Sequence, residues 1–299
     1  MLDEGRYPGI PYYRVPLFNI EDIFDPYRML NAYIEHGHNI GYHAHSFYEI
    51  NIVVSGCGVH YLGRERIEVS RGDVFIIPPY HWHAYEGPSD FDVYHVIFRP
   101  SFFSKHLLSF QQLPSFHSLF ELEPILRNRG GTTKHFRLCG EAFDKIIGGL
   151  DIVSRSMQVS ESTTLVAECH AIIAVSNLCE EYTKLQHTDA HSAEEAPFMH
   201  SISEIYERYR ENLTVDELCR IANLSRSAYI KKFRDSLGCT PHQFIMRERI
   251  KAAKSLLISS NMSTTEIADA VGFYDSSHFY KAFSAEVGCT PIEFKKNPK

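Results

Sequence analysis

The sequence predicts an α+β protein of more than one domain, with an N-terminal β-barrel or jelly roll, a helical segment, and a C-terminal domain made only of helices. Two observations carry this prediction: short strands with period-two alternation within residues 35–100, and an internal repeat within residues 200–299. At about 150 residues per domain, the 299 residues suffice for two cores. A content of 44% hydrophobic and 22% charged residues excludes disordered and collagen-like proteins.

Residues 1–20 form a predicted N-terminal arm, and residues 21–185 form the predicted first domain. Five segments of this domain alternate in polarity and are separated by Gly or Pro: Glu49 to Ser55, Val59 to Leu62, Glu65 to Val69, Asp73 to Ile77 and Asp92 to Phe98. Strands this short and regular are typical of a small barrel or jelly roll.

Two amphipathic helices are predicted at about residues 141–185. Apolar residues recur at helical spacing from Phe143 to Met157 and again from Leu165 to Tyr182. One face of the pair is expected to cover the barrel. Residues 186–199 are polar and without a period, and they form the predicted linker to a domain at residues 200–299.

The net charge of −7 is unevenly distributed along the chain. Residues 200–299 carry 15 Lys and Arg against 12 Asp and Glu, a net charge of +3, which leaves −10 for residues 1–199. Of the 17 histidines, 14 precede residue 200. A basic C-terminal third joined to an acidic, histidine-rich remainder favours polyanion binding at the C-terminal end.

Other sequence features bound the cellular setting. The seven cysteines include no Cys-x-x-Cys pair, which argues against a disulfide framework or a zinc ribbon. No apolar run approaches the roughly 18 residues of a membrane span, and the start carries no export signal. We therefore expect a cytoplasmic protein without membrane contact.

The internal repeat predicts two similar helical units. Gly238-Cys239-Thr240-Pro241-x-x-Phe244 recurs fifty residues later as Gly288-Cys289-Thr290-Pro291-x-x-Phe294. A capping box opens a short helix in each copy, at Thr214 and at Ser263, and Ser225 or Asp275 caps a second helix after a tight turn. Each copy is therefore a predicted helix-turn-helix, and a long helix from Pro241 to about Ser259 connects the two.

The repeat resembles the signature of the AraC-type transcription regulators. The resemblance covers about residues 200–299 and rests on Ile267-Ala268-x-x-Val271-Gly272-Phe273-x-x-x-Ser277-x-Phe279-x-x-x-Phe283 and the following Gly288-x-Thr290-Pro291-x-x-Phe294. It implies binding to double-stranded promoter DNA, with the second helix of each unit in the major groove. It also implies a homodimer through the helices at 141–185, for which intramolecular packing alone is the alternative, and RNA polymerase as a partner.

Helix geometry selects candidate DNA contacts on the faces opposite the buried aromatic residues. These candidates are Arg226, Ser227, Ile230, Lys231 and Lys232 in the first unit, and Ser276, Ser277, Tyr280 and Lys281 in the second. The alternative is that they form solvated helix faces.

The first domain resembles the cupin fold, which is common in sensor domains of AraC-type regulators. The motifs are Gly37-x5-His43-x-His45-x3-Glu49-x6-Gly56 and Gly72-x5-Pro78-x4-His83; the second departs from the family pattern at Tyr80 and Gly87. Alternation places His43, His45 and Glu49 on one face, and His83 would complete a set of metal ligands suited to a divalent ion.

Three interpretations of this set stay open: a ligand pocket with or without a metal ion, a metalloenzyme site, or structural histidines. The pocket is preferred, because a cupin enzyme would not need the C-terminal domain and a fold alone confers no chemistry. We therefore predict no enzyme activity, and no cofactor apart from the optional metal.

The predicted ligand-binding residues are His43, His45, Glu49, Trp82, His83 and Tyr85. Trp82 offers an apolar face on which a sugar ring can stack, while the other side chains offer hydrogen bonds. The motif spacing is similar to that of carbohydrate-responsive, rhamnose-type members, and Tyr7 to Pro16 resembles the arm that touches ligand in some relatives.

The sequence thus predicts a sequence-specific DNA-binding transcription regulator, expected to be an activator, that a sugar in the barrel controls. One alternative is a cupin metalloenzyme with an accessory DNA-binding domain. Another is a regulator that responds to protein contacts without a small-molecule effector.

Overall fold

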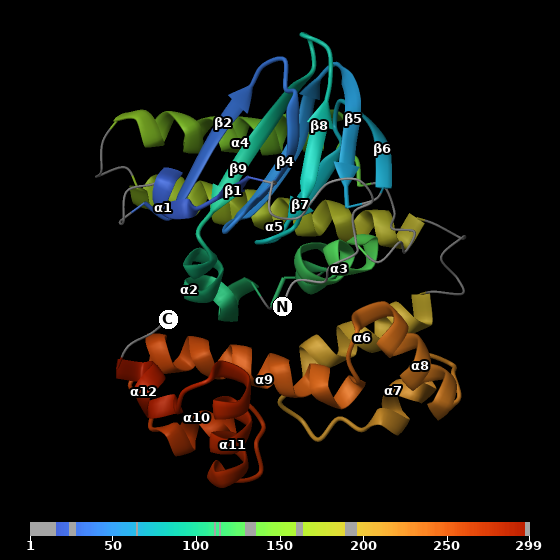
Figure 1. Ribbon diagram of the computed structural model, residues 1–299, viewed down its shortest axis with the longest axis vertical. Coiled ribbons are helices and arrows are strands. Elements are labelled where there is room, and N and C mark those ends of the chain that lie inside the picture. Colours follow the sequence, from blue (N-terminus) through green and yellow to red (C-terminus); the bar gives the residue numbers. More distant parts are fainter. Residues whose placement is uncertain are drawn as a thin grey trace. The chain divides into compact units, whose positions relative to one another are not determined.

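The computed structural model describes residues 16–23, 28–63, 65–110, 112–113, 115–128, 136–159, 164–188 and 196–296. The chain divides into two compact units, Met1–Phe103 with Gln112–Thr188, and Ser104–Gln111 with Asp189–Lys299. Figure 1 shows strands only in the first unit. The predicted fold class is therefore confirmed: β-sheets in the N-terminal part and helices in the C-terminal part.

Two β-sheets form the centre of the first unit. One has the strand order β1 (Leu17–Phe18), β3 (Ile40–His45), β8 (His83–Glu86), β5 (Cys57–Leu62) and β6 (Glu65–Ser70). The other has the order β2 (Leu30–Glu35), β9 (Asp92–Phe98), β4 (Tyr48–Ser55) and β7 (Val74–Ile77). Both sheets contribute buried side chains to one core, such as Leu62 and Tyr85 from the first and Val53 and Phe75 from the second. The sheets therefore pack face to face.

The five predicted strands are confirmed as β4, β5, β6, β7 and β9, with ends that agree within two residues. Sequence analysis did not identify β1, β2, β3 or β8 as separate strands. In β2 the alternation of buried and exposed side chains stops after Ala32, because the neighbouring apolar residues Tyr33 and Ile34 are both exposed. In β8 only four residues separate the flanking turns, which is too short for a period to show.

The helices of the first unit, apart from α1, follow the strands. They are α1 (Ile20–Ile23), α2 (Pro100–Phe110), which ends in the second unit, a π-helical turn at Ser118–Leu122, α3 (Glu123–Asn128), α4 (Gly140–Val159) and α5 (Thr164–Thr188). The two predicted amphipathic helices are confirmed as α4 and α5, and α4 packs against both α5 and β2, as Figure 1 shows. No described helix combines the length and apolar character needed to cross a membrane.

Two predicted segments fall partly outside the described residues. Of the arm, residues 1–15 lie outside, and β1 begins at Leu17. Of the linker, residues 189–195 lie outside, while α5 continues to Thr188 and α6 (Ala196–Arg208) begins at Ala196.

The second unit contains both predicted helix-turn-helix units. The first helix-turn-helix consists of α7 (Val215–Ile221) and α8 (Arg226–Leu237), and the second consists of α10 (Thr264–Ala270) and α11 (Ser276–Val287). The long α9 (Pro241–Ser259) connects them, and α12 (Pro291–Lys296) follows. The expected capping boxes are present at Thr214 and Ser263, so the helix starts are set by local sequence.

The two turns use equivalent residues with positive φ. Asn223 has φ 53° in the first turn and Gly272 has φ 91° in the second. Asn and Gly tolerate this left-handed region better than other residues. Each turn directs the following helix so that its aromatic pair is buried, Tyr229 and Phe233 in α8 and Phe279 and Phe283 in α11.

We predict that Gly272→Ala lowers the stability of the C-terminal helical unit more than Gly288→Ala does. Both glycines have positive φ, so each substitution costs about 1–2 kcal/mol in backbone strain. A Cβ at Gly272 would also lie 2.4 Å from the Arg210 carbonyl oxygen, whereas at Gly288 nothing lies within 4 Å. Overpacking adds about 1–3 kcal/mol. Urea unfolding of both variants measures the difference, and equal losses would contradict the prediction.

Candidate functional site

The carboxylate of Glu49 lies at the centre of a polar cluster between the two sheets. Glu49 comes from β4, and its Oε1 accepts a hydrogen bond from His95 Nδ1 of β9 at 2.8 Å. Its Oε2 lies 3.3 Å from His45 Nε2 of β3 and 3.6 Å from His83 Nε2 of β8. All four side chains are buried, so both sheets surround one carboxylate.

Strand register explains why these residues meet. On β3 and β8, His43 is directly paired with His83, and their ring centroids are 4.2 Å apart. On β4 and β9, Glu49 is the partner of Ile97 and Asn51 is the partner of His95. Because paired and diagonal side chains of neighbouring strands share a face, each sheet presents its polar residues to the other.

Three of the four predicted metal ligands are brought together. One ligand atom each from His45, Glu49 and His83 lies within 4.8 Å of the others, whereas His43 lies beside this group. His45 Nδ1 is 2.7 Å from the Phe47 carbonyl oxygen and donates to it, while Nε2 faces Glu49 at 3.3 Å. Two imidazoles and a carboxylate are a donor set that fits a divalent transition metal.

Burial sets the protonation of this cluster. It lowers the pKa values of His43, His60 and His83, so these rings are neutral at neutral pH. Burial by itself would raise the pKa of Glu49, but the facing His95 and hydrogen bonds from His45 and His95 hold it well below its usual range. The cluster therefore combines a charged carboxylate with the neutral imidazoles of His43, His60 and His83.

Several residues of the cluster were missed by sequence analysis. Asn51 Nδ2 donates to Glu49 Oε2 and to the Tyr85 hydroxyl, each at 3.3 Å, and the Tyr85 ring stacks on His60 at 3.9 Å. His60 Nε2 lies 3.3 Å from His83 Nδ1. The position of Asn51, two residues after Glu49 on one strand, was a usable signal, because alternate residues share a face.

Trp82 is placed apart from this cluster. It lines a small cavity together with Leu62, Pro78, Pro124 and Arg127. Trp82 immediately precedes His83, and successive side chains at a strand point to opposite faces, which accounts for the separation. Of the predicted ligand residues, His43, His45, Glu49, His83 and Tyr85 lie together.

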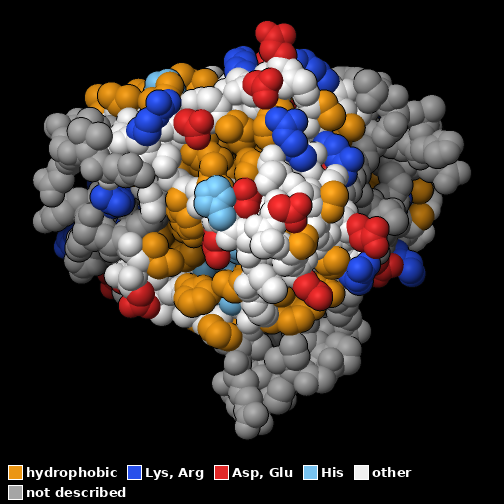
Figure 2. Space-filling model, turned by 90° about the horizontal axis from the view of Figure 1, so that it is seen from above, with side chains coloured by type: hydrophobic (Ala, Val, Ile, Leu, Met, Phe, Trp, Pro, Cys, Tyr) orange, Lys and Arg blue, Asp and Glu red, His pale blue; other side chains and the backbone are white. Residues whose placement is uncertain are grey.

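An open groove of about 770 Å³ is a second hollow of the first unit. Its lining comes mainly from β5 and β6 and the residues around them, and includes Val59, Arg66, Glu68, Glu86 and Arg137. The predicted ligand residues are not part of this lining. In the view from above, a histidine side chain lies at the surface beside acidic and hydrophobic side chains (Figure 2).

The candidate DNA contacts lie on α8 and α11, as expected for recognition helices. Arg226, Ser227, Lys231, Ser277 and Lys281 are exposed, and Ile230, Lys232, Ser276 and Tyr280 are half-buried. Some are engaged within the unit. Arg226 pairs with Asp216, Lys231 Nζ donates to Asp235 at 2.8 Å, and the Tyr280 hydroxyl donates to Thr264 at 3.2 Å.

Two further exposed side chains lie beside α11. Tyr274, in the turn before that helix, is fully exposed, and His278 in its first turn is exposed. They lie on either side of the N-cap residue Asp275.

Comparison with known proteins assigns both parts of the chain. Residues 29–176 match the family described as the AraC-like ligand binding domain, and residues 218–297 match a helix-turn-helix domain. The chain is 26% identical over 254 residues to the HTH-type transcriptional activator RhaS of Escherichia fergusonii, covering 85% of this chain and 87% of the relative. It is 24% identical to the transcriptional activator RhaR of Enterobacter sp., with 85% and 86% covered.

A further relative is the Msm operon regulatory protein of Streptococcus mutans, 23% identical with 88% of each chain covered. Among solved structures, the DNA-binding domain of AdpA in complex with a target DNA is 26% identical, covering 33% of this chain and 90% of that chain, with a TM-score of 0.33. The predicted regulator class, rather than an enzyme, is confirmed by the family matches and by the named regulators.

An AraC-like ligand-binding domain of facing β-sheets is thus followed by two helix-turn-helix units, and relatives matched over most of their length are transcription regulators. The chain therefore belongs to the AraC family of DNA-binding transcription regulators.

Proposed function

We propose that a sugar bound between the two sheets controls how the two helix-turn-helix units engage promoter DNA, and that the protein activates transcription in the cytoplasm. The observation that carries the effector is the ionised, buried Glu49 with the neutral His83 imidazole beside it. Adjacent sugar hydroxyls can each donate to a carboxylate and accept from an imidazole N–H, which makes this cluster suited to a polyol. Activation is supported by relatives named as transcriptional activators.

The proposed effector contacts are His43, His45, Glu49, His83 and Tyr85. Trp82 remains a proposed contact from the neighbouring cavity that it lines. A ligand that replaces the internal hydrogen bonds of Glu49 would shift both sheets at once, because Glu49 contacts β9 and β3 together. That link offers a route from the pocket to the rest of the first unit, which is the requirement for a binding event to change function elsewhere.

We predict that a monosaccharide raises the melting temperature of the protein and that Glu49→Gln abolishes this rise. A ligand at 100 times its dissociation constant stabilises the native state by about 2.7 kcal/mol. A thermal-shift screen against monosaccharides and divalent metals measures the effect. Glu68→Gln, on an exposed strand residue, is the matched control.

Because Glu49→Gln removes a buried charge, circular dichroism must show that the variant folds. His43→Gln, which leaves the hydrogen bonds of Glu49 in place, provides a second test. A sugar shift that persists in both variants would place the effector elsewhere. Shifts with metals alone, or with nothing in the screen, would overturn the sugar effector and favour a metal or a protein partner.

The DNA interface is proposed on the exposed faces of α8 and α11. The candidates are Arg226, Ser227, Ile230, Lys231 and Lys232 of the first helix-turn-helix unit, and Ser276, Ser277, Tyr280 and Lys281 of the second helix-turn-helix unit. Lys231 is paired with Asp235 across one helical turn, and such exposed pairs are weak. Phosphate contact would therefore replace this pair at little cost.

We predict that Lys231→Ala and Lys281→Ala each weaken specific DNA binding by about 1–3 kcal/mol and reduce its dependence on salt concentration. Lys145→Ala is the control, because it removes the same charge from an exposed position of α4 in the first unit. Fluorescence anisotropy with promoter DNA at several salt concentrations measures both quantities. Unchanged affinity in both variants would reject these helices as the recognition helices.

A homodimer is proposed through α5, with RNA polymerase as a further partner of the activator. Leu165, Cys169 and Ile173 recur at intervals of four residues on α5, so they form one helix face, and all three are exposed. Leu165 is 70% exposed and Ile173 is 51% exposed. A contiguous apolar face of this kind is typical of a protein interface.

We predict that the double variant Leu165→Asp, Ile173→Asp is monomeric, because two carboxylates would be buried without partners in the dimer seam. Analytical ultracentrifugation measures the mass in solution. Ile258→Asp is the matched control, since Ile258 is 55% exposed on α9. A wild-type protein that sediments as a monomer, or a double variant that remains dimeric, would refute the α5 interface.

A further inference from the structure

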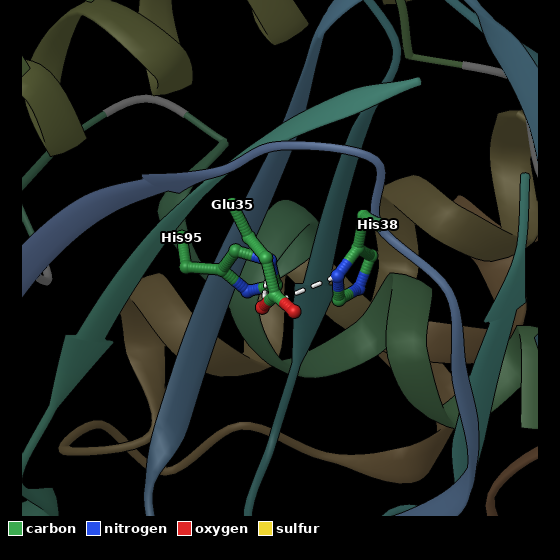
Figure 3. Close-up of side chains that lie close together, drawn as sticks. All are labelled: Glu35, His38 and His95. Carbon is green, nitrogen blue, oxygen red and sulfur yellow. Dashed lines mark ion pairs between the residues drawn. The ribbon is translucent and has the colours of Figure 1, made fainter. Parts of the chain in front are cut away.

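A second histidine and carboxylate cluster lies at the end of β2. It consists of Glu35 on β2, His38 in the following turn and His95 on β9, and one ligand atom of each lies within 4.8 Å of the others. Figure 3 shows the Glu35 carboxylate between the two imidazole rings. Glu35 Oε2 is 3.2 Å from His38 Nδ1 and 3.8 Å from His95 Nε2.

Local structure explains why these residues meet. Tyr33 of β2 pairs directly with His95, so Glu35, two residues further on, is the diagonal neighbour of His95 on the same face. Gly37, with φ 62°, then reverses the chain, and the amide of His38 donates to the Phe91 carbonyl at 2.7 Å. This bond fixes His38 beside β9, and its side chain is only 2% exposed.

The ring nitrogens and the carboxylate of this cluster face one another. His95 Nδ1 donates to Glu49, and Nε2, on the other side of the ring, faces the Glu35 carboxylate at 3.8 Å. Neither ring nitrogen of His38 nor His95 Nε2 has a well-formed hydrogen bond among the described residues. A bound cation would satisfy these ring nitrogens together with the Glu35 carboxylate.

We propose that Glu35, His38 and His95 bind a divalent transition-metal ion such as Zn²⁺, Co²⁺ or Ni²⁺, at a site distinct from His45, Glu49 and His83. Two imidazole nitrogens and one carboxylate oxygen favour these ions over Mg²⁺ and Ca²⁺, which prefer oxygen ligands. The Glu35 side chain is 45% exposed, so an ion can enter from solvent and keep open coordination positions.

The hydrogen bonding of His95 is suited to a histidine that binds a metal ion. A metal-bound histidine usually donates its other N–H to a carboxylate or carbonyl, which orients the ring and increases its basicity. His95 makes this bond to Glu49. Burial, followed by the neighbouring His95, lowers the pKa of His38 to about 4, so His38 is also a neutral ligand at neutral pH.

The proposed metal site lies outside the proposed effector pocket. The two are linked because its ligand His95 donates a hydrogen bond to Glu49 of that pocket. An ion on His95 Nε2 would hold the Nδ1–H on Glu49 Oε1, and so would position the carboxylate that is proposed to bind the effector. Metal and effector would then influence one another with equal strength in both directions.

Titration of the untagged, full-length, chelator-treated protein with Co²⁺ tests the site. We expect Co²⁺ to bind at this site with visible d–d absorption, and Glu35→Gln and His38→Gln each to weaken that binding by more than the roughly 10–100-fold typical of lost outer partners. His36→Gln is the matched control: His36 lies on the same turn, is 76% exposed and pairs with Asp92 at 2.9 Å. This variant should bind Co²⁺ as the wild type does.

His45→Gln separates the two clusters, because it disrupts the group at Glu49 Oε2 and leaves the proposed ligands in place. We expect the Co²⁺ ion at Glu35, His38 and His95 to persist in this variant. Absence of Co²⁺ binding in the wild type, or binding that Glu35→Gln and His38→Gln leave unchanged, would overturn the proposal. No sugar or DNA is present, so the outcome is independent of the proposed effector.

Discussion

The buried carboxylate of Glu49 is the interaction on which the N-terminal unit depends. An ionised group between two apolar layers is costly unless donors surround it. His95 and Asn51 provide them from its own sheet, and His45 contacts it from the facing sheet. The two sheets must therefore pack in the register that brings these residues together, and any ligand that competes for Glu49 acts on both sheets.

His95 extends this constraint to the edge of the unit. Its ring lies between two carboxylates, Glu49 in the interior and the half-exposed Glu35 at the end of β2. Occupation of one side of the ring determines which nitrogen carries the proton and so what the other side can accept. His95 therefore links the Glu49 cluster in the interior to Glu35 at the edge through a single imidazole.

In the C-terminal unit, local sequence determines where the helices begin and end. Capping boxes begin α7, α9 and α10, and glycines in the left-handed region end α8 and α11. Aromatic pairs then fix each recognition helix against its neighbours, with the Tyr229 hydroxyl 3.1 Å from Ser201. Two exposed cations of α8, Arg226 and Lys231, are paired with Asp216 and Asp235 within the same unit.

The sequence by itself determined the family, the strands β4 to β7 and β9, the capped helices and the placement of His45, Glu49 and His83 at one site, because these depend on period, capping and motif spacing. Tertiary structure decided what period alone does not contain. It placed Trp82 in another cavity, added Asn51 and His60 to the cluster, and brought Glu35, His38 and His95 together. Strand pairing and register, which spacing along the chain alone does not give, bring His95 beside Glu35 and Glu49 and His60 beside His83.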